Sequence, residues 1–477
     1  MESHEPNERS RIADDPPYHG TVTNGGEKDD LAPVNNSDGI KLIEEEEPTQ
    51  PTSGLTGGSV NLANSILGSG IIAQFPSAYL GTPYAFKQAG LPLGVILLFA
   101  IAGITDYSLN ILMKAAELAG SRSYQDLLQA SYGLPGYYFL TCIQFAYPLV
   151  AMIGYHVIIG DTISQVCERI FGENHVLANR YFVISVITLL ILLPLSFYKN
   201  VTKLVKVAFL SMVLLILLCV VIIIRIGTID IEVEPGDWNF ANINAIESVS
   251  ILTFAFVCHH NAFLIFASLE TPTQTMWKKV THYAVVMATI FLLIVGVTGY
   301  ITFKHFTQGD LLQNYCYTDD LVNIARVAFA ITIMCTYPLE CLVCREVVEN
   351  FIVRHGWVGS EPTLERHLIN TLIIVGIALG VSMSTECLGL VLILNGIFGA
   401  IPLIMILPAA CYIRWEGGKW YGWQKLPAIC LLVVGIAVVI SGIITIFVDH
   451  TVAECKTGEA FDYCNETNIQ LDRQLSS

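Results

Sequence analysis

Long apolar stretches follow one another along most of this chain, separated by short polar connections. Each has roughly the 20 mostly apolar residues that an α-helix needs to cross a bilayer. The eleven stretches lie at 59–90, 91–116, 137–169, 181–198, 202–226, 244–270, 279–303, 319–350, 366–386, 387–411 and 425–448. This pattern predicts an all-α polytopic membrane protein with eleven transmembrane helices.

The composition agrees with that prediction and sets one end of the chain apart. Of the 477 residues, 53% are hydrophobic and 14% are charged, whereas about a quarter of the residues in soluble domains are charged. Residues 1–58 instead carry thirteen acidic and four basic side chains, with few large apolar residues. Such a segment buries too little apolar surface to fold. We therefore expect a disordered acidic cytosolic tail at 1–58, a transmembrane domain at 59–448 and an extracellular or lumenal tail at 449–477.

The charges in the connections predict the orientation of the chain. With the N-terminus inside, thirteen Lys and Arg residues lie in inner connections and six in outer ones, as the positive-inside rule requires. The last tail contains the glycosylation triplet that starts at Asn465, and it also contains Cys455 and Cys464. We expect glycosylation at Asn465 and a Cys455–Cys464 disulfide, since both suit an oxidising compartment. The segment Asp38–Ile43 fits an acidic dileucine sorting signal, so plasma and endolysosomal membranes are both candidate locations.

Two of the apolar stretches are interrupted by residues that do not suit a continuous helix in a membrane. The first contains Gly68–Ser69–Gly70, and the sixth contains Cys258–His259–His260–Asn261. Backbone groups released from a helix in hydrocarbon are tolerated only where they line a cavity or bind something. Broken helices at corresponding positions of two repeats are typical of secondary transporters. Breaks in the first and sixth stretches predict two inverted repeats of five helices, plus one extra helix.

These breaks have the chemistry of a site for a zwitterion and a cation. Released N–H groups at a half-helix N-terminus favour an anionic group such as an α-carboxylate, and released carbonyls suit an ammonium group or a sodium ion. Asn64 lies one turn before the first break. The alternative is a close helix crossing at the glycines, with satisfied core polar residues. The candidate substrate-binding residues are Gly68, Ser69, Gly70, Cys258, His259 and Asn261.

The eighth stretch adds a second candidate for cation binding. Thr332 and Thr336 share one helical face, and Pro338 leaves one carbonyl of the helix without its usual donor. The alternative is that both hydroxyls bond back to their own helix. Three carboxylates within the stretches are candidates for proton coupling or structural pairing: Asp106, Asp161 and Glu340.

Several function classes lack support in the sequence. It contains no phosphate-binding glycine loop, no Ser/His/Asp arrangement and no basic nucleic-acid patch, so we expect no enzyme, no cofactor and no nucleic-acid partner. No selectivity-filter pattern or ring of like charges suggests a channel. The long acidic tail keeps one alternative open, an amino-acid-sensing transceptor with little or no transport.

Four motifs together resemble the sodium-coupled neutral amino acid transporters of the amino acid/auxin permease superfamily. They are Asn61–Ile72, Pro83–Gly90, Ala255–Asn261 and Thr336–Pro338, and the resemblance extends over 59–448. It implies a LeuT-type fold and a secondary active symporter that carries small neutral amino acids, with sodium, and in some members protons, as the driving ion.

The resemblance also assigns roles to single residues. Asn64 and Thr336 match an asparagine of the family's helix 1 and a threonine of its helix 8 that help to hold sodium. His259 matches the histidine that follows Val-Cys in the family's helix 6. The chain departs from the family at residues 73–80, which separate the Gly-Ile-Ile run from the Pro-Tyr-Ala motif. This insertion lies directly beside the expected substrate site.

Overall fold

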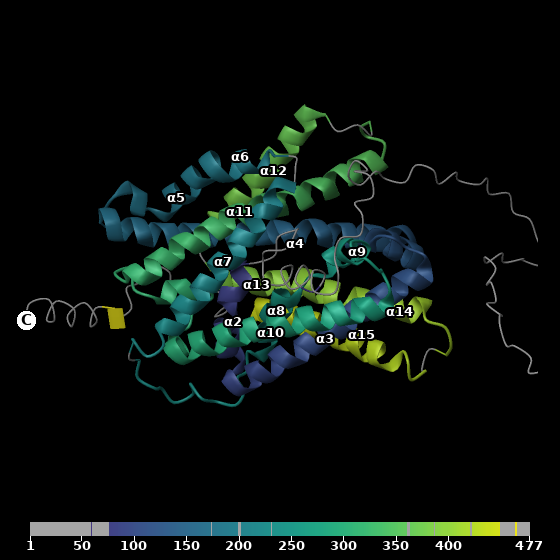
Figure 1. Ribbon diagram of the computed structural model, residues 1–477, viewed down its shortest axis with the longest axis horizontal. Helices are drawn as coiled ribbons and strands as arrows, with labels where there is room; N and C mark the ends of the chain where they lie inside the picture. The colour runs from purple at the N-terminus through teal and green to yellow at the C-terminus, as the bar shows by residue number, and fades with distance from the viewer. Residues whose placement is uncertain are drawn as a thin grey trace, which may run out of the picture. The chain divides into compact units, whose positions relative to one another are not determined.

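The computed structural model describes residue 59 and residues 76–172, 174–198, 202–229, 231–359, 363–385, 387–419, 422–448, 463 and 464. The regular elements assigned within these ranges are all helices (Figure 1). Among the described residues, seven helices are long and apolar enough to cross a membrane: Leu91–Ala119, Tyr124–Phe171, Gln274–Phe306, Asp320–Arg354, Leu364–Ser382, Leu388–Trp415 and Leu426–Phe447. Two shorter apolar helices, Arg180–Ser196 and Val213–Ile224, accompany them.

In chain order, the elements up to the middle of the chain are α2 (Pro76–Ala89), α3 (Leu91–Ala119), α4 (Tyr124–Phe171), η1 (Val176–Ala178), α5 (Arg180–Ile187), η2 (Thr188–Leu192), α6 (Leu193–Ser196) and α7 (Thr202–Ile224). The later elements are α8 (Ala245–Phe256), η3 (His259–Asn261), α9 (Ala262–Ala267), α10 (Gln274–Phe303), η4 (Lys304–Phe306), η5 (Leu311–Asn314), α11 (Asp320–Arg354), α12 (Leu364–Ser382), α13 (Leu388–Asn395), η6 (Gly396–Ala400), η7 (Pro402–Ile406), α14 (Leu407–Trp415) and α15 (Leu426–Val448). The expected first stretch, 59–90, is described only at Ser59 and from Pro76 onwards, and the second half of the expected insertion, 76–80, is helical.

Helix α4 begins thirteen residues before the stretch expected at 137–169. The Ser123 side chain caps its start by accepting from the backbone N–H of Asp126. At Gly133 the backbone turns to φ 67° and ψ −156°, so α4 is two helices joined across a kink. Glycine adopts this positive φ without the penalty of a Cβ, and Pro135 follows two residues later. The polar residues before the kink hide this first part of the helix from a hydropathy pattern.

Helices α4 and α11 pack against each other in antiparallel directions along their length (Figure 1). At one end the Arg169 guanidinium lies 3.0 Å from the carboxylate of Asp320. At the other end the Arg354 guanidinium lies 3.9 Å from the centre of the Tyr137 ring. Between these ends the thiol of Cys344 contacts the carbonyl of Phe145 at 3.5 Å. This pair supplies one wall of the region that the site occupies.

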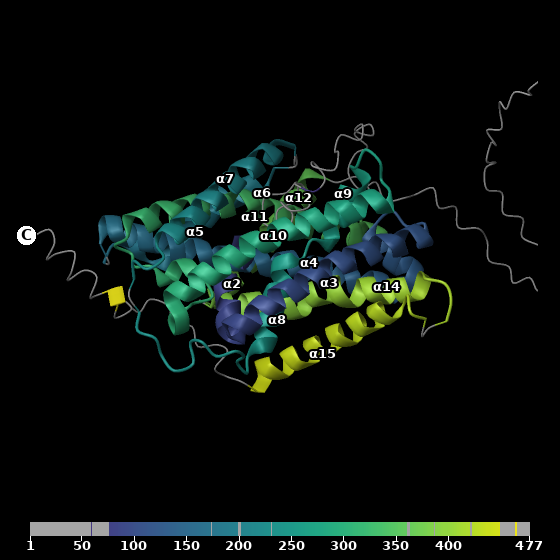
Figure 2. The ribbon, with the colours of Figure 1, turned by 60° about the horizontal axis from the view of Figure 1, so that its bottom comes forward.

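The expected 387–411 stretch is a helix with two π-helical turns, η6 and η7, between α13 and α14. Pro402 at the start of η7 has no N–H to donate, which favours a local change of helix type. Gly399 in η6 admits the Tyr147 ring, because a Cβ there would lie 2.6 Å from a ring carbon. This helix is therefore irregular, like the broken stretch at 244–270. Since π-turns frequently mark functional sites, it is a further candidate element of the site. Figure 2 shows α15 running beside α14.

The prediction of a Cys455–Cys464 disulfide is wrong. Cys464 is bonded instead to Cys316, 148 residues earlier, with 5.6 Å between the Cα atoms. Tyr463 supports this connection, since its hydroxyl donates to the carbonyl of Asn314 at 2.7 Å. The physical reason is that the chain around η5 lies next to Tyr463 and Cys464 despite the long sequence separation. Cys387 is also disulfide-bonded.

Candidate functional site

The stretch at 244–270 is interrupted as expected. Helix α8 ends at Phe256, and Val257 turns to an extended conformation with φ −70° and ψ 122°. Cys258 follows with φ −144° and ψ 9°, and His259–Asn261 form a single 3₁₀ turn before α9 begins. Cys258 and His259 are fully buried. The regular i to i−4 hydrogen-bond ladder therefore stops inside the protein, where buried backbone groups need another partner.

His259 is fixed in the break by a hydrogen bond from α3. Its Nε2 lies 3.0 Å from the Ser108 hydroxyl, and that hydroxyl in turn donates to the carbonyl of Ile404 in η7. Because the Ser108 proton is used on Ile404, its oxygen accepts from His259 Nε2–H, which assigns the neutral Nε2–H tautomer. The buried Nδ1 has no hydrogen-bond partner within the described part of the chain. This lone pair is suited to accept from an N–H donor such as a substrate ammonium group.

His260 faces helix α4 rather than α3. Its ring lies 5.8 Å from the ring of Tyr147, which also packs edge-on against Phe254 at 5.9 Å. The carbonyl of Tyr147 accepts from the Asn395 side chain at 3.1 Å. Tyr147 thus joins α4, the broken helix and the α13–η6 segment at one point.

Thr336 lies on α11, the helix that packs against α4. It is buried, and its hydroxyl donates to the carbonyl of Ile333 at 3.0 Å. Thr332 likewise donates to Ala328 at 3.1 Å. Both threonines therefore bond back to their own helix, while their oxygen lone pairs stay available to a cation. Tyr155 of α4 lies within interaction distance of Thr336.

The described residues contain part of the expected site. Cys258, His259 and Asn261 lie together in the break, and Thr336 lies on α11 beside Tyr155 of α4. Asn64, Gly68, Ser69 and Gly70 lie outside the described residues, as do Cys455 and Asn465. The sequence analysis missed Ser108, Tyr147 and the π-turns. Their sequence signals are weak: a serine in the short polar run Thr105–Ser108 of an otherwise apolar helix, an aromatic residue before Pro148, and the Gly-x-x-Gly pair before Pro402.

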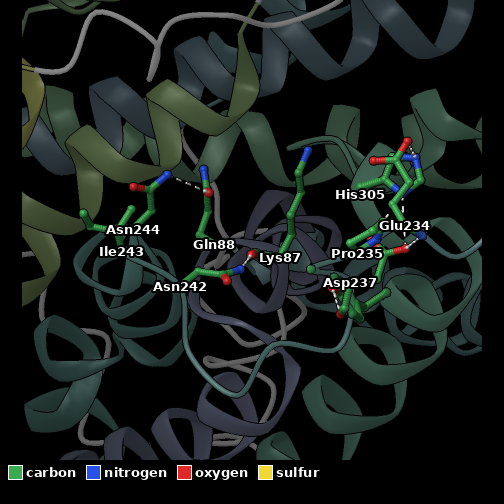
Figure 3. Close-up of a pocket in the computed structure, with 11 residues that line it drawn as sticks. Lys87, Gln88, Glu234, Pro235, Asp237, Asn242, Ile243, Asn244 and His305 are labelled. Atoms are coloured by element: carbon green, nitrogen blue, oxygen red, sulfur yellow. Dashed lines mark hydrogen bonds and ion pairs between the residues drawn. The ribbon is translucent and has the colours of Figure 1, made fainter.

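A cavity of about 370 Å³ opens near the C-terminal end of α2 and next to the acidic connection between α7 and α8. Its lining includes Lys87, Asp237 and His305 (Figure 3). His305 Nδ1 lies 3.1 Å from a carboxylate oxygen of Asp237, and the Lys87 ammonium donates to the carbonyl of Thr307 at 3.1 Å. Asn242 donates to the carbonyl of Lys87 at 2.9 Å. These contacts fasten the connection over the ends of α2 and α10.

Comparison with known proteins gives consistent matches over most of the chain. Residues 51–448 match the profile of a family described as "Transmembrane amino acid transporter protein". "Putative sodium-coupled neutral amino acid transporter 11" from Danio rerio is 39% identical over 421 residues, covering 87% of this chain and 91% of that protein. The Homo sapiens protein of the same name is 38% identical over 82% of this chain and 96% of its own length.

A more distant relative and a solved structure also match. "Vacuolar amino acid transporter 2" from Saccharomyces cerevisiae is 30% identical and covers 80% of each chain. The crystal structure of MhsT in complex with L-phenylalanine superimposes with a TM-score of 0.53 at 12% identity, over 81% of this chain and 97% of that one. At this low identity the structural match concerns the fold alone. It supports the expected LeuT-type fold class.

Proposed function

Because this chain belongs to the transmembrane amino acid transporter family, we propose that it is a secondary active symporter for small neutral amino acids driven by a sodium gradient. The observation that carries this proposal is the break at Val257–Asn261, where every residue except the half-buried His260 is buried. A broken helix inside a membrane domain supplies backbone dipoles to a bound substrate and ion. The names of the relatives include both sodium coupling and neutral amino acids.

We assign the substrate's amino group to the break in the sixth stretch. The buried lone pair of His259 Nδ1 accepts N–H donors, and Cys258 and Asn261 line the same turn. The substrate carboxylate is assigned to Gly68, Ser69 and Gly70. A half-helix N-terminus suits an anion, and we propose that the first stretch is broken at these three residues.

The sodium ion is assigned to Asn64 and Thr336. A hard cation takes oxygen ligands, and the Thr336 hydroxyl keeps its lone pairs while its proton bonds to Ile333. The acidic N-terminal tail and the C-terminal tail are proposed to lie on opposite sides of the membrane, the first in the cytosol. The membrane is the plasma membrane or an endolysosomal membrane.

Uptake into liposomes tests the proposal directly. The purified protein, reconstituted with a labelled neutral amino acid outside, should accumulate it when a sodium gradient is imposed and stop when the gradient is collapsed. Saturable binding without accumulation under sodium or proton gradients would contradict a symporter and favour the transceptor. In the matched variant Asn64→Ala, the sodium concentration for half-maximal uptake should rise while the amount of reconstituted protein stays unchanged.

A further inference from the structure

Glu340 is a carboxyl group placed deep inside the membrane domain. It lies on α11, twenty residues after Asp320 and fourteen before Arg354. At about 1.5 Å per residue it is therefore about 30 Å from one helix end and about 21 Å from the other. Its side chain is buried, with 3% of its surface exposed. Ionisable groups at such depth are costly and usually functional.

This carboxyl has no compensating charge among the described residues. One oxygen, Oε1, is buried and has no hydrogen-bond partner there, and no ion pair with Glu340 is present. The nearest cation along α11, Arg345, is engaged elsewhere, since it donates to the Ser196 carbonyl and to the Thr371 hydroxyl, each at 3.0 Å. An ionised carboxylate in this place would keep its full desolvation cost.

The other two intramembrane carboxylates named from the sequence differ in this respect. Asp161 lies 2.6 Å from the guanidinium of Arg180, and Asp106 lies 3.4 Å from His282 with a partly exposed side chain. Both have the contacts of structural pairs. Glu340 alone of the three lacks one.

The groups around Glu340 link it to the break in the sixth stretch. The hydroxyls of Tyr147 and Tyr155 on α4 and the thiol of Cys344 on α11 interact electrostatically with it. Tyr147 is the residue whose ring contacts His260 at 5.8 Å. Pro338, two residues earlier, removes a hydrogen bond from α11 beside it. Tyr147 therefore connects Glu340 with the broken helix.

We propose that Glu340 binds a proton that the protein exchanges once in each transport cycle. The assignment rests on the proposed symport and adds a second coupled ion to it. The carboxylate takes the proton from water when Glu340 is exposed to one side of the membrane. It holds the proton as a neutral carboxyl in the buried arrangement described here, and it releases the proton to water on the other side. Only an O–H bond forms and breaks, and no other reactant is needed.

Reconstituted liposomes with a trapped pH-sensitive dye test this assignment. In the wild type, uptake of a neutral amino acid should change the lumenal pH, and a proton gradient at equal sodium should change the uptake rate. Glu340→Gln mimics the neutral carboxyl, so it should lose both effects and retain one-for-one exchange of labelled for unlabelled substrate, which needs no net proton movement. Glu346→Gln, a carboxylate six residues further along the same helix, should behave as the wild type.

The outcomes separate this inference from the proposed function. Sodium-driven uptake in the wild type without any lumenal pH change overturns the proton site and leaves the symporter intact. Proton-coupled uptake in Glu340→Gln at the wild-type level also overturns it. A wild type that accumulates nothing under either gradient removes the proposed function, and the proton site with it. If Glu340→Gln does not fold, Glu340→Asp keeps a titratable group and should retain proton coupling with a shifted pH profile, and a flat profile would overturn the assignment.

Discussion

The ring of Tyr147 lies 5.8 Å from the imidazole ring of His260. This contact joins the long α4–α11 pair to the interrupted helix. The carbonyl of Tyr147 also accepts from the Asn395 side chain, and its ring packs against Gly399. Tyr147 therefore contacts both the break and the helix that contains the π-turns η6 and η7.

Adding a methyl group at Gly399 should disturb the break through Tyr147. The new Cβ would lie 2.6 Å from the Tyr147 ring, so Gly399→Ala should cost about 1–3 kcal/mol of folding free energy and raise the KM for the amino acid. Thermal unfolding and uptake kinetics measure both. Gly380→Ala, on α12 with open space around it, is the matched control and should leave both unchanged or slightly raise stability. Equal behaviour of the two variants would contradict the packing described here.

Removing the Ser108 hydroxyl should weaken the placement of His259. Ser108→Ala leaves His259 Nε2–H and the Ile404 carbonyl without their shared partner, at a cost of about 1–3 kcal/mol. We expect a higher KM for the amino acid with little change in the sodium dependence. The control Ser185→Ala removes a hydroxyl that bonds only to its own helix, and it should have almost no effect. A Ser108→Ala variant with wild-type stability and KM would remove Ser108 from the site.

Asp310, in the connection between α10 and α11, should make stability depend on pH. Burial and then the nearby charge of Asp161 raise the pKa of Asp310 to about 7, from about 3.9 in an unfolded chain. The folded state therefore holds the proton more tightly, so this stabilising contribution is complete below pH 4 and is lost as the pH rises through about 7. Compared with Asp310→Asn, the wild type should lose about 1.4 kcal/mol per pH unit between these values and then level off. Parallel pH dependence of the two unfolding curves would contradict this.

The disulfide pairing predicts a specific cross-linked peptide. Digestion without reduction should yield the Cys316 and Cys464 peptides joined. Replacing both cysteines with serine should lower the unfolding free energy by about 2–4 kcal/mol, because the bond closes a long loop. Cys142→Ser together with Cys430→Ser, two exposed free cysteines, should change little. Recovery of a Cys455–Cys464 peptide instead would overturn the pairing.

Hydropathy predicted much of the helix framework because a bilayer demands long apolar stretches with few exceptions. The break at Cys258–Asn261 was predictable for the same reason, since three consecutive polar residues stand out in an apolar helix. Ser108 and Tyr147 were not predictable, because a lone serine or tyrosine in such a helix most often bonds locally or packs in the core.

The disulfide pairing could not be predicted from the sequence for a different reason. Cys316, Cys455 and Cys464 all lie outside the apolar stretches, but sequence distance alone favours the wrong pair. Which two meet depends on the tertiary contact between the connection before α11 and Tyr463, whose hydroxyl donates to the carbonyl of Asn314. The start of α4 escaped prediction similarly, because the kink at Gly133 needs the backbone conformation rather than hydropathy.

Electron cryomicroscopy of the protein with a bound neutral amino acid and sodium would show whether the break in the sixth stretch holds the substrate. We expect density for the amino group against Cys258–Asn261, with His259 Nδ1 within hydrogen-bond distance, and for the carboxylate against Gly68–Gly70. A ligand bound elsewhere, or a continuous helix through residues 257–261 in the substrate-bound protein, would contradict it.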